Sequence, residues 1–174
     1  MKKFLTVFMV LLFLSTLLNA AEKTNNELKK HSFGIGFGVP YGGLGLNADF
    51  AMGSNFYIST GVGGGFGFTG GIRYIFTSLE KTFRPRISLF YGNNSLAKVE
   101  YSYKDSEYEE YKGVTILLGA QWMFGHKKRH GFDFDVSHNL SDDYNSNDFI
   151  GKPGVIKVTE PGKTSLSFGY RYSF

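Results

Sequence analysis

The last nine residues are Leu166-Ser167-Phe168-Gly169-Tyr170-Arg171-Tyr172-Ser173-Phe174. In this stretch, bulky apolar residues alternate strictly with small or polar ones. Successive side chains of a β-strand point to opposite faces, so one face of such a strand carries only leucine, phenylalanine and tyrosine. The other face carries serine, glycine and arginine. A strand with one apolar and one polar face suits a transmembrane β-barrel, whose strands separate lipid from lumen. The stretch therefore predicts an all-β fold of that kind.

The composition supports strands along the whole chain. The 174 residues include 23 Gly, 18 Phe and 11 Tyr, with four Pro and one Trp. So much glycine is unfavourable for helices, but it suits strands that have a small inner face and a bulky outer face. The absence of cysteine excludes a disulfide scaffold, a thiolate metal site and a lipid-modified cysteine.

The beginning of the chain predicts export. Lys2 and Lys3 precede an apolar run over 4–18, and small residues follow at Ala20 and Ala21. This pattern is typical of a secretory signal peptide cleaved after Ala20. We expect three parts, listed in chain order: a signal peptide at 1–20, a flexible periplasmic lead-in at 21–31 and a barrel domain at 32–174. Without Lys2 and Lys3 the formal charge of +4 falls close to neutral, which gives no electrostatic case for nucleic acid as a partner.

The alternation falls into nine blocks, whereas a single-chain bacterial barrel has an even number of strands. If the first two blocks form one strand, kinked by a β-bulge at Pro40–Gly43 where the phase flips, the barrel has eight strands. If 150–159 adds a strand closed by a turn at 160–163, it has ten.

Loop lengths favour eight strands, because periplasmic turns are usually short and external loops long. That scheme pairs 155–158 with the top of the last strand. It makes 63–65, 92–95 and 125–131 periplasmic, and it makes 52–54, 77–83, 104–112 and 141–163 extracellular.

The last strand resembles a known assembly signal. Its aromatic face, with Phe168, Tyr170, Tyr172 and Phe174, is similar to the carboxy-terminal signal of bacterial outer-membrane β-barrel proteins, which the outer-membrane assembly machinery reads. The whole predicted mature chain resembles the eight-stranded class that includes the transmembrane domain of outer membrane protein A. This resemblance implies an integral protein of the Gram-negative outer membrane, in contact with outer-membrane lipid and lipopolysaccharide. It does not imply one activity, because such barrels have many functions.

Eight charged residues are predicted on the inner face, and they have balanced signs. Burying charges is costly unless they pair, and an eight-stranded barrel is just wide enough for its own side chains. We therefore expect an ion-pair network that fills the lumen rather than a wide pore. The alternative is a narrow channel or a porin-like barrel that transports a small ligand. The residues are Asp49, Arg73, Arg86, Lys98, Glu100, Asp133, Asp135 and Arg171.

No catalytic, cofactor-binding or metal-binding residues are predicted. His138 lies near Ser137 and Ser141, but both serines fall on the opposite face of a regular strand, so a lipid-modifying outer-membrane enzyme is the less favoured alternative. His126 and His130 have a spacing that pairs metal ligands on a helix, but strands flank them here, which favours a solvated basic turn.

We expect a non-enzymatic barrel with an envelope-structural or surface-interaction role. The external segment 104–112 combines four acidic residues with Tyr108 and Tyr111. Because tyrosine is favoured at interfaces, the two tyrosines could serve an unidentified protein partner, while a solvated loop is the default interpretation of the segment.

Overall fold

The computed structural model describes residues 31–174 except 66, 104, 143, 146–152 and 161. The predicted signal peptide and nearly all of the predicted lead-in lie outside the described residues. Among these residues, no helix is long and apolar enough to cross a membrane. A short 3-10 helix, η1 (Val39–Tyr41), follows the first strand. The strands are β1 (Ser32–Gly38), β2 (Gly43–Ala51), β3 (Phe56–Gly65), β4 (Gly67–Ile75), β5 (Phe83–Tyr101), β6 (Glu107–Phe124), β7 (His130–Asp142), β8 (Val155–Thr159) and β9 (Thr164–Ser173).

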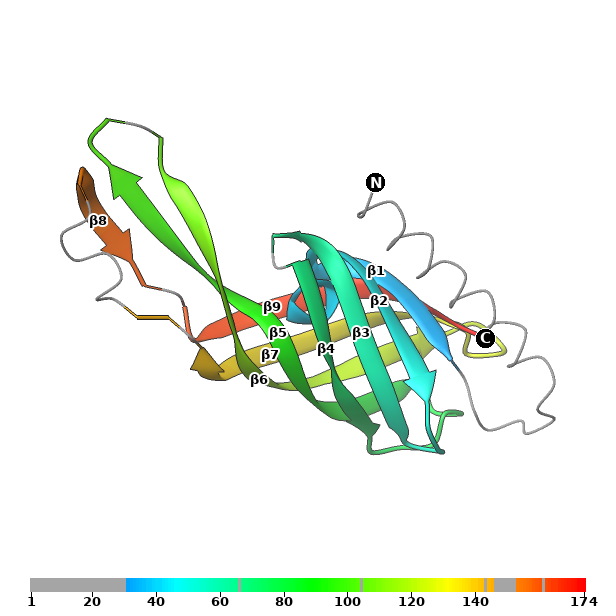
Figure 1. Ribbon diagram of the computed structural model, residues 1–174. Coiled ribbons are helices and arrows are strands. Elements are labelled where there is room, and N and C mark those ends of the chain that lie inside the picture. The colour runs from blue at the N-terminus through cyan, green and yellow to red at the C-terminus, as the bar shows by residue number, and fades with distance from the viewer. Residues whose placement is uncertain (1–30, 66, 104, 143, 146–152, 161) are drawn as a thin grey trace, which may run out of the picture.

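Eight of these strands form a closed antiparallel barrel (Figure 1). Their order around the barrel is β4-β3-β2-β1-β9-β7-β6-β5, and a β4–β5 pairing closes the ring. The described strand β8 lies outside the ring and pairs with β5. The predicted all-β, eight-stranded, up-and-down architecture is confirmed, and the ten-strand alternative is wrong.

The roles predicted for the segments 40–43 and 92–95 are exchanged: the first is a turn and not a bulge, and the second is a bulge and not a turn. The β1–β2 register runs from Ser32↔Asp49 to Gly38↔Gly43, so the first two blocks form a hairpin and not one kinked strand. Gly42 makes the turn possible because it adopts the left-handed conformation, with φ of 66°, and donates its N–H to the carbonyl of Val39. The predicted turn at 92–95 instead lies inside β5, where the register shifts at a bulge. The two errors cancelled in the strand count.

The corrected hairpins also change which turns share an end of the barrel. Ser32 pairs with Ser173, so β1 begins where β9 ends. The connections 52–55, 76–82 and 125–129 lie at this end, which we call the base. The predictions that placed 63–65 at the base, and 52–54 and 77–83 at the opposite end, are wrong. Those for 125–131, 104–112 and 141–163 agree with the strand order, although 107–112 is strand rather than loop.

Beyond the barrel, β5 and β6 continue as a long hairpin that projects from the end opposite the base (Figure 1). We call residues 94–101 and 107–112, together with β8, the arm. Its small core contains Ala97, Val99 and Tyr111, packed against Val158 and Tyr144. The prediction that 155–158 pairs with the last strand is wrong, since Val158 lies opposite Val99 of β5.

Alternation sorts the barrel side chains into an inner and an outer set, as the period of two requires. On β7, for example, Asp133 and Asp135 are buried whereas Phe132, Phe134 and Val136 are exposed. Val39 does not continue the outer face of β1, because η1 turns it into the barrel. His31, placed in the predicted lead-in, packs at the base, where its carbonyl accepts the N–H of Phe174.

Candidate functional site: the barrel interior

Six charged side chains from five strands meet in the middle of the barrel. Each lies on the inner phase of its strand, and all are 4% exposed or less. Three arginines face three aspartates, so the formal charges of the layer cancel. The residues are Asp49 of β2, Arg73 of β4, Arg86 of β5, Asp133 and Asp135 of β7, and Arg171 of β9.

Arg171 and Arg86 connect the carboxylates. Arg171 Nη1 lies 2.6 Å from Asp49 Oδ2, and its Nε donates to Asp133 Oδ2 at 2.7 Å. Arg86 donates two parallel hydrogen bonds, of 2.9 and 2.6 Å, to the two carboxylate oxygens of Asp135. This is the strong bidentate arrangement. Arg86 Nη1 also lies 3.1 Å from Asp133 Oδ1, while Arg73 pairs with Asp49. The layer is therefore one connected network.

Neutral polar groups satisfy much of the remaining hydrogen-bonding capacity. Arg171 donates to Asn47 Oδ1 at 2.6 Å and to Ser32 Oγ at 2.7 Å. Ser59 Oγ donates to Asp49 Oδ1 at 2.5 Å, and Arg73 Nε donates to Ser88 Oγ at 3.2 Å. Buried ion pairs are tolerated when such bonds accompany them, so this shell explains how the charges stay inside.

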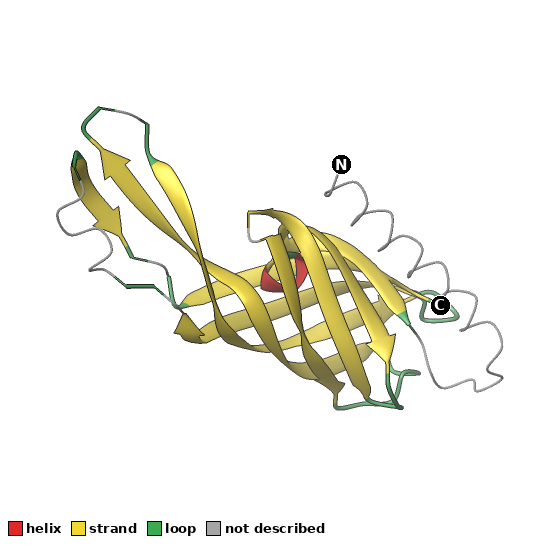
Figure 2. Cartoon of the chain, in the orientation of Figure 1, coloured by secondary structure: helices red, strands yellow, loops and turns green. Residues whose placement is uncertain are grey.

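The η1 segment folds into the barrel near the end that bears the arm (Figure 2). Tyr41 is fully buried, and its hydroxyl donates to Asp133 Oδ2 at 2.9 Å. Asn47 Nδ2 donates to the carbonyl of Pro40 at 2.9 Å, and Thr69 Oγ1 donates to that of Val39 at 3.0 Å. The inserted segment is thus bonded to the barrel wall and to the charged network.

Inner-face glycines make room for the Tyr41 ring. A Cβ on Gly169 would collide with the ring and hydroxyl of Tyr41, and one on Gly36 would lie 2.9 Å from the ring. Gly34 borders the same ring at 3.3 Å. These glycines of β1 and β9 form a slot for the ring, which stays open because glycine has no Cβ.

Apolar side chains border the charged layer on both sides. Val39, Phe90 and Leu117 cluster on the side of the arm. Toward the base, the cluster contains Ala51, Tyr57, Ile75 and Leu79. Leu79 comes from the β4–β5 connection, and buried Arg84 holds that connection by donating to the carbonyls of Leu79 and of Lys81.

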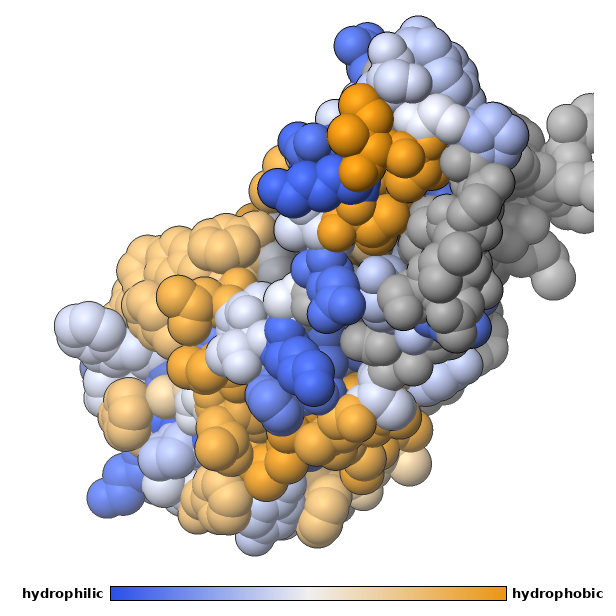
Figure 3. Space-filling model, turned by 90° about the vertical axis from the view of Figure 1, so that its left-hand side faces the viewer, coloured by the Kyte–Doolittle hydropathy of each residue, from blue (hydrophilic) through white to orange (hydrophobic). Residues whose placement is uncertain are grey.

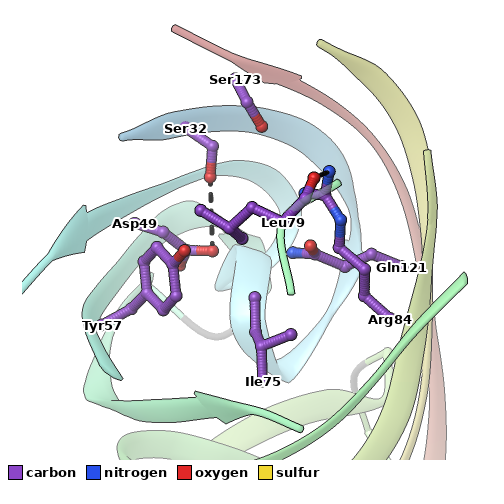
Figure 4. A pocket seen from close by; sticks show the side chains of 8 residues that line it. All are labelled: Ser32, Asp49, Tyr57, Ile75, Leu79, Arg84, Gln121 and Ser173. Carbon is purple, nitrogen blue, oxygen red and sulfur yellow. Dashed lines mark hydrogen bonds between the residues drawn. The ribbon is translucent and has the colours of Figure 1, made fainter. Parts of the chain in front are cut away.

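A small cavity remains between the charged layer and the base (Figure 4). Its volume of about 10 Å³ is close to the minimum that holds one water molecule. The buried hydroxyl of Tyr57 borders it and has no hydrogen-bond partner among the described residues. The other lining residues are Ser32, Asp49, Ile75, Leu79, Arg84, Gln121 and Ser173. A cavity of this size is far too small for a diffusing solute.

Two of the eight predicted lumen charges lie elsewhere. Lys98 and Glu100 are on the arm, with side chains 38% and 36% exposed, and they pair with each other at 2.7 Å. This hydrogen bond and the opposite charge raise the pKa of Lys98 and lower that of Glu100. The prediction went wrong because the alternation of β5 continues after the barrel has ended.

Tyr41 and Arg84 are interior residues that were not predicted from the sequence. Tyr41 belongs to a segment interpreted as a kink, and a side chain folding back into a barrel leaves no local periodic signal. The available hint was the row of inner glycines at 34, 36 and 169, which implies that another group occupies their space. Arg84 stands on the inner phase of β5, and alternation alone could have identified it.

The histidines and serines that were considered for an enzyme or a metal site make other contacts. Exposed His138 contacts Thr164 Oγ1 at 3.2 Å, while buried Ser137 bonds to Ser165 inside. Ser141 Oγ accepts the N–H of Val114. His130 contacts the hydroxyl of Tyr170 at 2.5 Å. Within the described ranges, no group of three or more His, Cys, Asp or Glu side chains could hold a metal ion.

Large apolar side chains cover the outside of the barrel. Viewed from the end that bears the arm, hydrophobic side chains gather around the barrel, with hydrophilic ones near the middle of that end (Figure 3). The residues of the predicted assembly signal belong to this surface: Phe168, Tyr170, Tyr172 and Phe174 are 36–42% exposed. The barrel is therefore polar inside and apolar outside, the reverse of a water-soluble barrel.

No family model and no curated protein matches the chain. The crystal structure of the N-terminal β-barrel domain of Pseudomonas aeruginosa OprF superposes with a TM-score of 0.42 and 10% sequence identity, over 84% of this chain and 96% of that one. A similarity this weak assigns no function to this chain, whose barrel is defined by its own strand pairing.

Proposed function

We propose that this protein is a non-enzymatic, integral outer-membrane β-barrel with a closed interior, which holds the arm outside the membrane for surface interactions. The observation that carries the proposal is the combination of a filled lumen and an apolar exterior. Tyr41 and the six paired charges occupy the middle of the barrel, and apolar clusters border them on both sides.

The exposed side chains support insertion into a membrane. Ile35, Ile72, Leu118 and Val136 are 51–59% exposed and come from four different strands. A water-soluble monomer rarely exposes an apolar surface that continues around it. In a barrel spanning a membrane, the same surface faces lipid. The signal-peptide pattern at 1–20 and the aromatic last strand are consistent with export to the outer membrane.

The arm supports a role at the cell surface. In a barrel of this type the base, where β9 ends, faces the periplasm, and the arm then projects outward. The arm and its tip present exposed Tyr103, Tyr108 and Ile156, each 66–68% exposed, beside several carboxylates. Exposed aromatic side chains of this kind suit a protein partner, and the carboxylates suit the divalent cations that bridge lipopolysaccharide.

Planar bilayer recordings test the closed interior. The folded wild-type protein, inserted after its heat-modifiable migration has been verified, should give no steady conductance steps. Steady steps from the wild type would contradict a closed lumen and favour the narrow-channel alternative.

Cysteine labelling on intact cells tests where the arm lies, because the natural chain has no cysteine. Ser106→Cys lies at the tip of the arm, and His126→Cys is the matched site at the base; both positions are exposed. A membrane-impermeant maleimide should label only Ser106→Cys on intact cells and both variants after lysis. Labelling of His126→Cys alone before lysis would reverse the proposed orientation.

A further inference from the structure

A strongly basic turn stands at the base of the barrel. Residues 125–129, which we call the basic turn, join β6 to β7 and include consecutive Lys127, Lys128 and Arg129. The connection 52–55 at the same end of the barrel is uncharged, and 76–82 adds Glu80 and Lys81. The three connections at the base thus carry four basic side chains and one acidic side chain, a formal charge of +3 with histidines neutral.

The basic turn is fixed against its neighbours on both sides. Lys128 Nζ donates to Thr82 Oγ1 at 2.7 Å, and the carbonyl of Arg129 accepts the N–H of Ser173 at 2.7 Å. Figure 1 accordingly shows it beside the carboxy-terminal end of β9. Lys127 and Arg129 are exposed. Their charges therefore have a defined position on the barrel.

Aromatic side chains form a girdle directly next to this turn. Trp122 lies opposite Phe83, and both are more than half exposed. Phe124 stacks on His130 with ring centroids 6.1 Å apart, and Tyr172 lies 5.1 Å from His130. Aromatic girdles of membrane barrels mark the level of the lipid headgroups. The basic turn begins directly after Phe124, and its first cation, Lys127, follows that ring by three residues. In an inserted barrel, this spacing would place the cations near the lipid phosphates.

We propose that the basic turn binds the phosphate groups of anionic phospholipids in the leaflet at the base. This inference rests on the proposed insertion into a membrane. Ammonium and guanidinium groups donate charge-assisted hydrogen bonds to phosphate oxygens. At the opposite end of the molecule, the lysines of the arm stand among the acidic residues Glu107, Glu109 and Glu110, whereas the base connections carry one acidic side chain.

The single tryptophan gives a direct test, because Trp122 lies in the girdle two residues before β6 ends. The full chain is reconstituted in phosphatidylcholine vesicles that contain a minor fraction of brominated lipid. Quenching of Trp122 should show that brominated phosphatidylglycerol is enriched about fivefold next to the protein, relative to brominated phosphatidylcholine. This ratio corresponds to about 1 kcal/mol, the attraction of one basic side chain to an anionic membrane surface. High salt should remove most of the difference.

Matched charge variants locate the effect. Lys127→Gln/Lys128→Asn/Arg129→Gln should abolish the preference; asparagine is chosen because residue 128 has a positive φ of 48°. Lys98→Gln/Lys157→Gln/Lys163→Gln removes three cations at the other end and should keep it. Equal quenching of the wild type by both lipids, or a preference that survives in the first variant, would overturn the inference. No quenching by either lipid would instead contradict membrane insertion itself.

Discussion

Asp133 is the residue on which most of the interior depends. It accepts hydrogen bonds from Arg171 and Tyr41 and lies against Arg86, so three inserted or buried groups share one carboxylate. Removing one partner from a buried ion-pair network leaves an uncompensated charge, which is more costly than the pair itself.

Asp133→Ala should therefore destabilise the folded barrel by about 3–5 kcal/mol. Urea unfolding in lipid vesicles, followed by the fluorescence of Trp122, measures the change. Glu100→Ala is the control, because it breaks an exposed pair on the arm and should move the midpoint little. Equal effects of the two substitutions would contradict the assignment of Asp133 to the buried network.

Gly169 and Tyr41 should be energetically coupled. Gly169→Ala places a methyl group against the Tyr41 ring, so the alanine should cost less once that ring is gone. A double-mutant cycle with Tyr41→Ala should give a coupling energy of about 0.5–3 kcal/mol, measured by the same unfolding assay. Additive effects would mean that Tyr41 does not occupy the glycine slot in the folded protein.

The charged residues inside the barrel could be predicted only in part from the alternation of residues along each strand. Asp49, Asp133 and Arg171 were identified because they follow the alternation of short strands. Lys98 and Glu100 follow it equally well, yet their part of β5 lies beyond the barrel. A period of two tells which face of a strand a side chain occupies, but not whether that stretch belongs to the barrel or to the arm.

At the scale of elements, the outer face of β6 crosses the proposed lipid layer. Leu118 pairs with Ile87 and Val136 near the middle of the barrel, and Leu140 lies past the last β7–β9 pair. Both side chains are 58–59% exposed. Leu118→Arg should destabilise by about 2–4 kcal/mol and Leu140→Arg by about 0–1, because the cost depends on depth in the bilayer. Unfolding in vesicles compares them, and equal costs would place the bilayer elsewhere.

The last strand should direct assembly through its aromatic end. The N–H of Phe174 bonds to His31, and the ring stacks on Tyr172 on the outer face. Deleting Phe174 should lower the amount of folded protein in the outer-membrane fraction, while Phe174→Tyr should keep it. Immunoblots of the fractions measure this. Unchanged levels after the deletion would argue against the resemblance to an assembly signal.

The position of turns was the least predictable property of the elements. The segments 40–43 and 92–95 both interrupt the alternation with glycine and polar residues, so they look alike in the sequence. One is a hairpin turn and the other a bulge because of the strands that pair with them: β2 folds back on β1, whereas β6 stays paired with β5 past the interruption. That information is non-local.

At the scale of the whole molecule, the chain has an acidic arm at one end and a basic turn at the other, joined by a barrel that is apolar outside and charged inside. The alternation along the predicted mature chain was sufficient to predict this class of fold. The arm could not be predicted, because its strands show the same alternation of apolar and polar residues as those of the barrel. Its extent depends on where β4 and β7 stop pairing with their neighbours.

We propose above that the barrel is folded within a membrane, and gel migration of cell fractions, with and without boiling, is the first measurement to make. We predict a band in the outer-membrane fraction whose mobility changes on boiling, as expected of a barrel that resists detergent until heated. A band in the soluble periplasmic fraction that does not shift would mean that the protein is not a membrane barrel.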